Sequence, residues 1–327
     1  MVQRREFILA GAGLAAGGFV NTAAMAQVAR GVPRLLIGFP PGGAVDVLAR
    51  ALQPKLHSDT VPFIVENKPG AGGRLAVLET KRAPADGHTV LVTADPILTI
   101  YPYAFRNVGY DPIADLIPVT PLASEAMGLV LGPMVPASVR NLADFIDWCR
   151  KNPGDASYAT AAAGTTMHFV GALLAQSAKF SFTHIPHRGA AAGVQDVMGG
   201  QIASTIVTMS QVIPLMSTGK LRVVAVTSPA RMKRMPEIPT FVELGYKAID
   251  SIVYYGTYVK AGTPPAVVAA LAANIQAASM TPEMVNTREK MGVDDLVLSP
   301  EKFAAFFKAD YERWGPIVKA SGYKADE

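Results

Sequence analysis

Short apolar runs that end at glycine- or proline-rich turns are the feature that most constrains this chain. Residues 35–39 (LLIGF) form such a run, and residues 40–43 (PPGG) end it. Within residues 45–52, apolar side chains then recur at the spacing of one helical face. A continuous apolar strand is typical of a sheet that is covered on both faces. The pattern therefore predicts an α/β fold with a mostly parallel, doubly wound sheet.

The same alternation continues to the end of the chain. Further strands are predicted at 63–66, 89–93, 128–131, 158–160, 182–185, 202–207, 221–226 and 253–259, and helices at 141–150, 169–174, 190–198, 267–278 and 303–314. The aromatic residues of the last helix have helical spacing, and we expect them in the core. At 327 residues the chain has room for about two domains.

The composition excludes several classes of protein. Half of the residues are hydrophobic and 17% are charged, which excludes intrinsic disorder. The net charge of +4 comes from 30 basic and 26 acidic residues that are mixed along the chain, so no nucleic-acid partner is expected. Cys149 is the single cysteine, which rules out an internal disulfide and a cysteine-based zinc cluster.

Residues 1–26 have the features of a signal peptide. Arg4 and Arg5 precede an uncharged stretch that ends in the cleavage motif Ala24-Met25-Ala26. We expect cleavage after Ala26 and a periplasmic mature protein. The Arg-Arg-Glu-Phe-Ile stretch also resembles a twin-arginine signal, so both export routes stay open. Residues 11–16 fit a dinucleotide fingerprint, but no acidic residue lies between Glu6 and Asp46, and no cofactor is expected.

Four turns rich in glycine or hydroxyl groups open predicted helices. They comprise residues 40–46, 69–74, 164–168 and 186–190. A helix N-terminus carries unpaired N–H groups and a partial positive charge, and glycine allows a ligand to approach that backbone closely. Such turns lie where open α/β sheets bind their ligands, and they suit carboxylates or phosphates. None has the triphosphate-binding pattern GxxxxGK[ST].

Catalytic and metal-binding patterns are sparse. The chain has no GxSxG elbow, and the proline inside His184-Ile185-Pro186-His187 argues against a helical pair of ligands. His168 could complete a three-histidine zinc site, or act as a base for Thr165 or Thr166. Helix capping by these threonines is the simpler interpretation. We therefore expect no metal, no catalytic residues and no enzymatic activity.

Several motifs carry a resemblance to a known family. Residues 39–50 (FPPGGAVDVLAR), 65–73 (VENKPGAGG) and 85–91 (ADGHTVL) resemble signatures of the Bug receptors, the periplasmic solute-binding components of tripartite tricarboxylate transporters. Matching stretches then follow in family order, at 164–168, 199–201, 219–222, 239–245 and 255–264. The resemblance covers nearly all of the mature chain.

The resemblance implies a type II periplasmic-binding-protein fold, with two doubly wound lobes joined by two crossing segments. The first lobe would comprise residues 27–121 plus 254–327, and the second residues 122–253. A small organic carboxylate would bind in the cleft between them, and membrane permease subunits would be the protein partners. A monomer is expected.

Ligand-binding residues follow from the glycine turns and from the resemblance. The first lobe is expected to hold a carboxylate with its two glycine loops, and the second to contact the rest of the ligand. The predicted residues are Phe39, Pro41, Gly42, Gly43, Ala44, Asp46, Gly70, Gly72, Thr93, Asp95, Thr165, Thr166, Met167, His168, Arg188, Gly189, Thr208 and Tyr254.

Departures from the family pattern bear on the charge of the ligand. Ala203 and Val207 stand where the family usually has aspartates, which disfavours a ligand that carries an ammonium group. Arg188 would favour a second carboxylate if it faced the cleft. We therefore expect a plain mono- or dicarboxylate rather than an amino acid, with Asp46 and Asp95 as the acids that could replace the lost pair.

Two other functions remain open at this point. The protein could be a ligand-loaded sensory partner of a membrane histidine kinase, or an exported hydrolase on the same scaffold. The absence of a nucleophile, base and orienting group argues against the hydrolase. Nothing in the sequence separates transport from signalling.

Overall fold

The computed structural model describes residues 32–56 and 61–325. Val32–Glu327 forms one compact unit of the chain. The predicted signal peptide lies outside the described residues, as does its cleavage site.

The first half of the sheet contains three parallel strands. Strands β1 (Arg34–Ile37), β2 (Ile64–Asn67) and β3 (Thr89–Ala94) pair with β1 in the middle. The helices α1 (Ala44–Leu52) and α2 (Arg74–Arg82) connect them. Three successive β1 side chains, Leu35, Leu36 and Ile37, are fully buried, which confirms the prediction of a strand covered on both faces.

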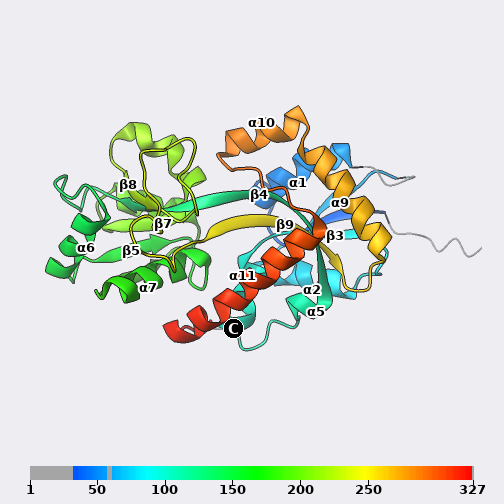
Figure 1. Cartoon of the computed structure of the whole chain (residues 1–327), viewed down its shortest axis with the longest axis horizontal. Helices are drawn as coiled ribbons and strands as arrows, with labels where there is room; N and C mark the ends of the chain where they lie inside the picture. Colours follow the sequence, from blue (N-terminus) through cyan, green and yellow to red (C-terminus); the bar gives the residue numbers. More distant parts are fainter. Residues whose placement is uncertain (1–31, 57–60, 326–327) are drawn as a thin grey trace, which may run out of the picture. The chain divides into compact units, whose positions relative to one another are not determined.

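Two long strands continue the sheet beyond β3 (Figure 1). Strand β9 (Ile252–Lys260) pairs with β3, and β4 (Leu116–Leu131) pairs with β9 from Leu116 to Ala126. From Met127 onward, β4 pairs instead with β7 (Ser204–Thr208) and β8 (Arg222–Val226). Strand β4 therefore belongs to both halves of the sheet. Because these pairings are antiparallel, the sheet is mixed rather than mostly parallel.

The second half of the sheet repeats the parallel arrangement. Strands β5 (Ser157–Thr160) and β6 (Thr183–Pro186) run parallel, and β7 joins β5 to β4, so the whole order is β2-β1-β3-β9-β4-β7-β5-β6. Helices α6 (Leu142–Lys151), α7 (Thr166–Ala178) and α8 (Ala190–Met198) belong to this half, and all three were predicted.

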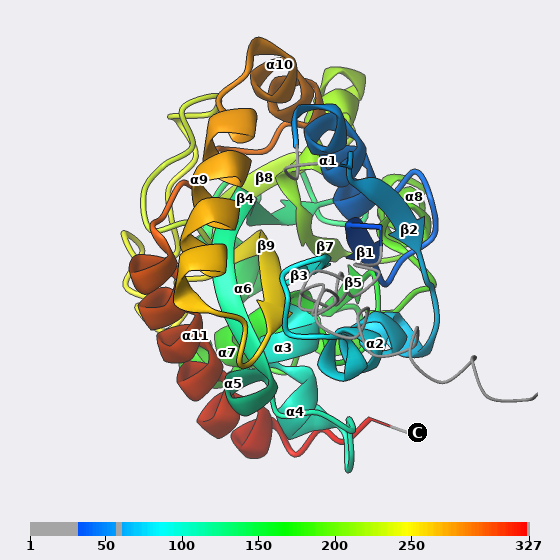
Figure 2. The same cartoon turned by 90° about the vertical axis from the view of Figure 1, so that its right-hand side faces the viewer.

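The C-terminal helices return to the first half of the sheet. Helices α9 (Pro265–Ser279) and α11 (Pro300–Ser321) lie alongside β4 and β9, and α10 (Pro282–Met291) follows α9 (Figure 2). Of the α11 aromatic side chains predicted to lie in the core, Phe303, Phe307 and Trp314 are buried, whereas Phe306 and Tyr311 are half-buried. The remaining helices are short: η2 (Gln53–Lys55), η3 (Ala71–Gly73), α3 (Pro96–Thr99), α4 (Tyr101–Ala104), α5 (Pro112–Asp115), η4 (Met209–Gln211) and η5 (Ile213–Thr218).

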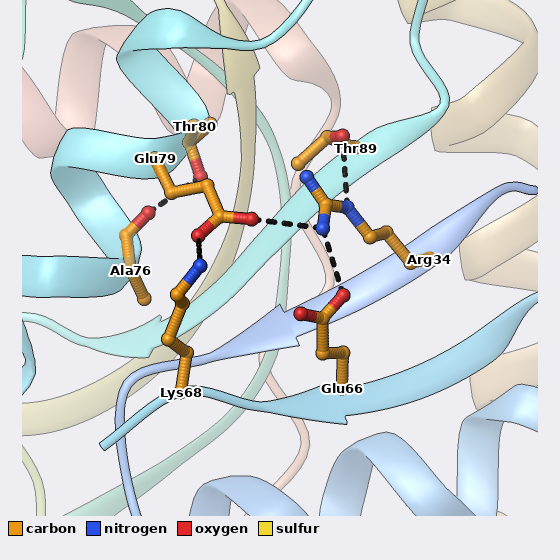
Figure 3. Close-up of polar contacts among 7 residues, drawn as sticks. All are labelled: Arg34, Glu66, Lys68, Ala76, Glu79, Thr80 and Thr89. Carbon is orange, nitrogen blue, oxygen red and sulfur yellow. Dashed lines mark hydrogen bonds and ion pairs between the residues drawn. The ribbon is translucent and has the colours of Figure 1, made fainter. Parts of the chain in front are cut away.

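An ion-pair network holds the start of the second glycine loop (Figure 3). Arg34 of β1 contacts Glu66 of β2 at 2.7 Å and Glu79 of α2 at 2.8 Å, and Glu79 also pairs with Lys68. Lys68 directly precedes the loop. The loop also packs tightly against the end of β1, since a Cβ at Gly38 would lie 2.7 Å from the Gly73 Cα.

Candidate functional site

A pocket of about 230 Å³ lies between the two halves of the sheet. Its lining comes from β3, β4, β7, β9, α1, α3, α7, η4 and the loop before α7. The residues are Ala44, Ala94, Pro96, Glu125, Ala161, Thr165, Thr166, Met167, Thr208, Ser210, Gln211, Val253 and Tyr255. The volume is below the ~300–1,000 Å³ of sites for drug-sized ligands, so the pocket suits a small molecule.

Two helix N-termini open onto this pocket, one from each half of the sheet. Ala44 is the first residue of α1, and Thr165 is the N-cap of α7. Neither helix has a side-chain cap, and the Thr165 hydroxyl donates to the Ala162 carbonyl at 3.0 Å instead of capping α7. The unpaired N–H groups and the partial positive charge of both helices are therefore available to an anion.

Thr166 adds a hydroxyl to the same wall of the pocket. Its side chain is 1% exposed, and its Oγ1 has no hydrogen-bond partner among the described residues. A buried hydroxyl without a partner costs about 1–3 kcal/mol, and a bound ligand or water removes that cost. Thr166 is thus placed to bind a polar ligand group.

Glu125 is the acidic residue of the pocket, and the sequence-based prediction missed it. Its side chain is 3% exposed, and the Tyr255 hydroxyl donates to its Oε1 at 2.6 Å. None of the described residues pairs with its Oε2 in regular hydrogen-bond geometry. Burial raises the pKa of Glu125 above its usual value, and the hydroxyls of Ser210, Tyr255 and Thr208 act in the opposite direction.

Strand alternation explains which predicted residues do not line the pocket. On β9, Val253 and Tyr255 line it, whereas Tyr254 points to α11 and donates to Asp310 at 3.3 Å. On β3, Ala94 lines it, whereas the predicted Thr93 is not part of the lining. Asp95 lies at the end of β3 and accepts the Tyr254 N–H at 3.0 Å. Successive strand residues point to opposite faces, so Tyr255, and not the predicted Tyr254, lines this pocket.

The carboxylate of Asp46 is occupied within its own loop. It accepts from the Gly42 N–H and from Arg50, both at 2.9 Å, and from Asn67 at 2.8 Å. Burial alone would raise the pKa of Asp46, but these hydrogen bonds hold it below the usual value. Asp46 therefore fixes the first glycine loop against β2. Four other predicted residues of this loop are not part of the pocket lining: Phe39, Pro41, Gly42 and Gly43.

The remaining predicted residues also lie outside the lining. They are Gly70, Gly72, His168, Arg188 and Gly189. Arg188 is exposed. The predicted residues that the pocket does bring together are Ala44, Thr165, Thr166, Met167 and Thr208.

The histidines have separate partners. His168 stacks on His184 at 4.0 Å between ring centroids, and burial lowers the pKa of both to about 4. His187 contacts Asp196 at 2.8 Å. Across residues 32–56 and 61–325, no group of three or more His, Cys, Asp or Glu side chains could hold a metal ion.

A second pocket, of about 280 Å³, is lined by Pro229, Asp250, Ser251, Ile252, Tyr254, Phe306, Ala309, Asp310 and Arg313. Its one basic side chain is already occupied, because Arg313 pairs with Asp310 at 2.7 Å and also donates to the Asp250 carbonyl. The first pocket is therefore the better candidate site for a carboxylate.

Comparison with known proteins agrees with this arrangement. A two-lobed α/β fold with a pocket between the lobes defines a solute-binding protein of the type II periplasmic class. This chain belongs to the tripartite tricarboxylate transporter receptor family, whose model matches residues 47–323. The predicted resemblance to the Bug receptors is confirmed.

Individual relatives cover most of the chain. A UPF0065 protein from the tcbD-tcbE intergenic region of Pseudomonas sp. (strain P51) is 32% identical over 86% of this chain and 84% of its own length. Protein BugT of Bordetella pertussis is 28% identical over 89% of each chain. The structure of R. palustris Rpa4515 with adipate superposes with a TM-score of 0.76 at 26% identity, covering 89% of this chain and 97% of that one.

Proposed function

We propose that this protein captures a small organic carboxylate in the pocket between α1 and α7 and presents it to the membrane permease subunits of a transporter. The observation that carries the proposal is the pair of uncapped helix N-termini that open onto one pocket. Family membership and the adipate bound to Rpa4515 support a carboxylate as the ligand.

We divide the protein into the two lobes expected from the sequence, residues 27–121 plus 254–327 and residues 122–253. The path of β4 supports this division, because its pairing changes from β9 to β7 between Ala126 and Met127. The chain returns between β8 and β9. The predicted residues around the pocket, including the glycine loops, would contact the ligand when the lobes close on it.

The protein acts as a monomeric receptor and performs no chemistry on its ligand. It is exported to the periplasm after cleavage behind Ala26, and none of the helices in the described part of the chain is long and apolar enough to cross a membrane. A role beside a sensor kinase has no specific support in the site, so transport is the function we favour.

Two variants test the site from its two sides. At Gly43 an added Cβ would meet only the Pro40 carbonyl oxygen, at 3.8 Å, so Gly43→Val should fold and yet crowd the α1 N-terminus. Thr166→Val removes the unpaired hydroxyl at α7. We expect each to weaken carboxylate binding about tenfold, or ~1.4 kcal/mol. The matched control is Thr287→Val, a half-buried position on α10 whose hydroxyl donates to the Glu283 carbonyl within the same helix.

The probes are C3–C8 mono- and dicarboxylates, including adipate, tested by thermal shift and then by calorimetry. A ligand at 100 times its dissociation constant should add about 2.7 kcal/mol of stability. Unchanged affinity in both folded variants would refute the site. Failure of every carboxylate to bind the wild type would refute the function.

A further inference from the structure

We infer that the carboxylate ligand also carries a protonated amine, and that Glu125 is the specificity-determining residue that binds this amine through Oε2. The inference rests on the proposed function, because it concerns a second group of the same ligand in the same pocket. It is carried by the position of Glu125 and by the charge balance of the lining.

Glu125 occupies the point at which β4 passes from one half of the sheet to the other. It pairs in register with Val253 of β9, and two residues later Met127 pairs with Thr208 of β7. The Tyr255 hydroxyl occupies Oε1, which leaves Oε2 as the acceptor without a regular partner in a side chain that is 3% exposed. A hydrogen-bond donor from the ligand would complete this carboxylate.

The lining contains no cation to balance that carboxylate. Glu125 is the one acidic residue among the described residues of the lining, which include no Lys, Arg or His. An unpaired buried charge costs several kcal/mol. Burial raises the pKa of Glu125, and the hydrogen bonds from Ser210, Tyr255 and Thr208 oppose this rise only in part. An ammonium group in the pocket would supply the missing positive charge and favour the ionised carboxylate, whereas a plain carboxylate would be repelled by it.

The sequence features that favoured a plain carboxylate do not line this pocket. Ala203 and Val207 are buried in the apolar core, so their side chains do not report the charge of the ligand. Arg188, which was expected to favour a second carboxylate if it faced the cleft, is not part of the lining, and neither are His187 and His168. The helix N-termini and Glu125 together present a site for one negative and one positive group.

Matched pairs of probes test the inference, each pair differing by one amino group: succinate and aspartate, glutarate and glutamate, 4-methylpentanoate and leucine. By calorimetry at pH 7.5, we expect wild-type protein to bind the amino member of its preferred pair at least about tenfold more tightly, or ~1.4 kcal/mol. Glu125→Gln keeps the shape and the acceptor for Tyr255, and should reduce this preference to below about threefold. Glu289→Gln, an exposed position on α10, is the matched control and should retain it.

A second variant and the pH dependence provide independent readouts. Tyr255→Phe removes the donor to Oε1, disfavours the ionised carboxylate and should also reduce the preference. Affinity for the amino member should fall as the pH falls through the pKa of Glu125. The groups that face this carboxylate are Tyr255, Ser210 and Thr208, and Tyr255 is also subject to the charge of Asp95.

The outcomes distinguish a failure of the inference about Glu125 from a failure of the proposed function. If the wild type prefers the probe without the amine, or if both variants keep the wild-type preference, the inference is overturned while carboxylate capture stands. If neither member of any pair binds, nor any plain carboxylate, the proposed function fails and the inference fails with it.

Discussion

Two buried aspartates show that the surroundings of a residue, and not its type, decide its role here. Asp46 is held by three hydrogen bonds, and its pKa is lowered. Asp95 accepts the Tyr254 N–H through one oxygen, and its other oxygen has no partner among the described residues. Burial and the nearby Asp310 raise the pKa of Asp95 well above its usual value, and Arg313 opposes them.

The opposite pKa shifts of Asp46 and Asp95 predict opposite effects on stability when each carboxylate is replaced by an amide. A raised carboxyl pKa stabilises the fold at low pH, and this stability is lost as the pH rises. Asp95→Asn should therefore have a higher melting temperature than wild type. The difference in melting temperature should grow from pH 5 to pH 8 and reach at least ~2 °C, which corresponds to about 1 kcal/mol in the free energy of unfolding. The titratable groups that interact with Asp95 are Asp310, Arg313, Tyr254, Tyr255 and Tyr258.

Asp46→Asn is the counterpart. A lowered carboxyl pKa contributes stability at neutral pH that is lost as the pH falls, so this variant should be about 1–3 kcal/mol less stable at pH 7, and its deficit should shrink towards pH 3. Thermal melts of both variants across this range check the pair. If the difference in melting temperature between Asp95→Asn and wild type became smaller as the pH rises, the raised pKa of Asp95 would be contradicted.

The glycine turns and the hydroxyl residues at the start of α7 could be predicted from the sequence, because turn chemistry is local. Glu125 could not be assigned to the pocket in that way, although a single acid in an otherwise uncharged strand was a visible signal. Which face of β9 meets the pocket also depends on tertiary packing. Tyr255 lines the pocket and Tyr254 does not, and the two differ only by strand alternation.

At the level of elements, most strands and helices were predicted, because burial on both faces leaves continuous apolar runs. The beginning of β4 was missed. Its prolines, Pro118 and Pro121, lack backbone donors and have the appearance of breaks in a strand, but each lies beside a register shift against β9 that accommodates it. Helix α10 was missed because its apolar positions are few.

The C-terminal ends of α7 and α11 allow a prediction about stability. Lys179 ends α7 with φ 52° and ψ 60°, a left-handed conformation that costs a side-chain-bearing residue about 1–2 kcal/mol. Lys179→Gly should therefore stabilise the protein by about 0.5–1 kcal/mol. Gly322 ends α11 with φ 68°, and no atom lies within 4 Å of an added Cβ.

Gly322→Ala is the reverse change at the corresponding position after α11. It should lower the free energy of unfolding by about 1 kcal/mol. Urea denaturation measures both changes. A Lys179→Gly variant that is less stable than wild type would show that contacts of the lysine side chain outweigh its backbone strain.

In the whole molecule, the candidate site depends on both halves of the sheet. Helix α1 follows β1 and helix α7 follows β5, and the pocket between their N-termini exists only because β4 and β9 join the two halves. A ligand that contacts both N-termini favours the arrangement that brings them together, which is the physical basis for closure in a receptor of this kind.

A crystal structure of the complex with whichever carboxylate stabilises the protein would show where the ligand binds. We expect ligand carboxylate oxygens within about 2.7–3.2 Å of first-turn N–H groups of α1 or α7, with the Thr166 hydroxyl as a further partner. A carboxylate bound at exposed Arg188, or in the second pocket beside Asp310 and Arg313, would contradict this expectation.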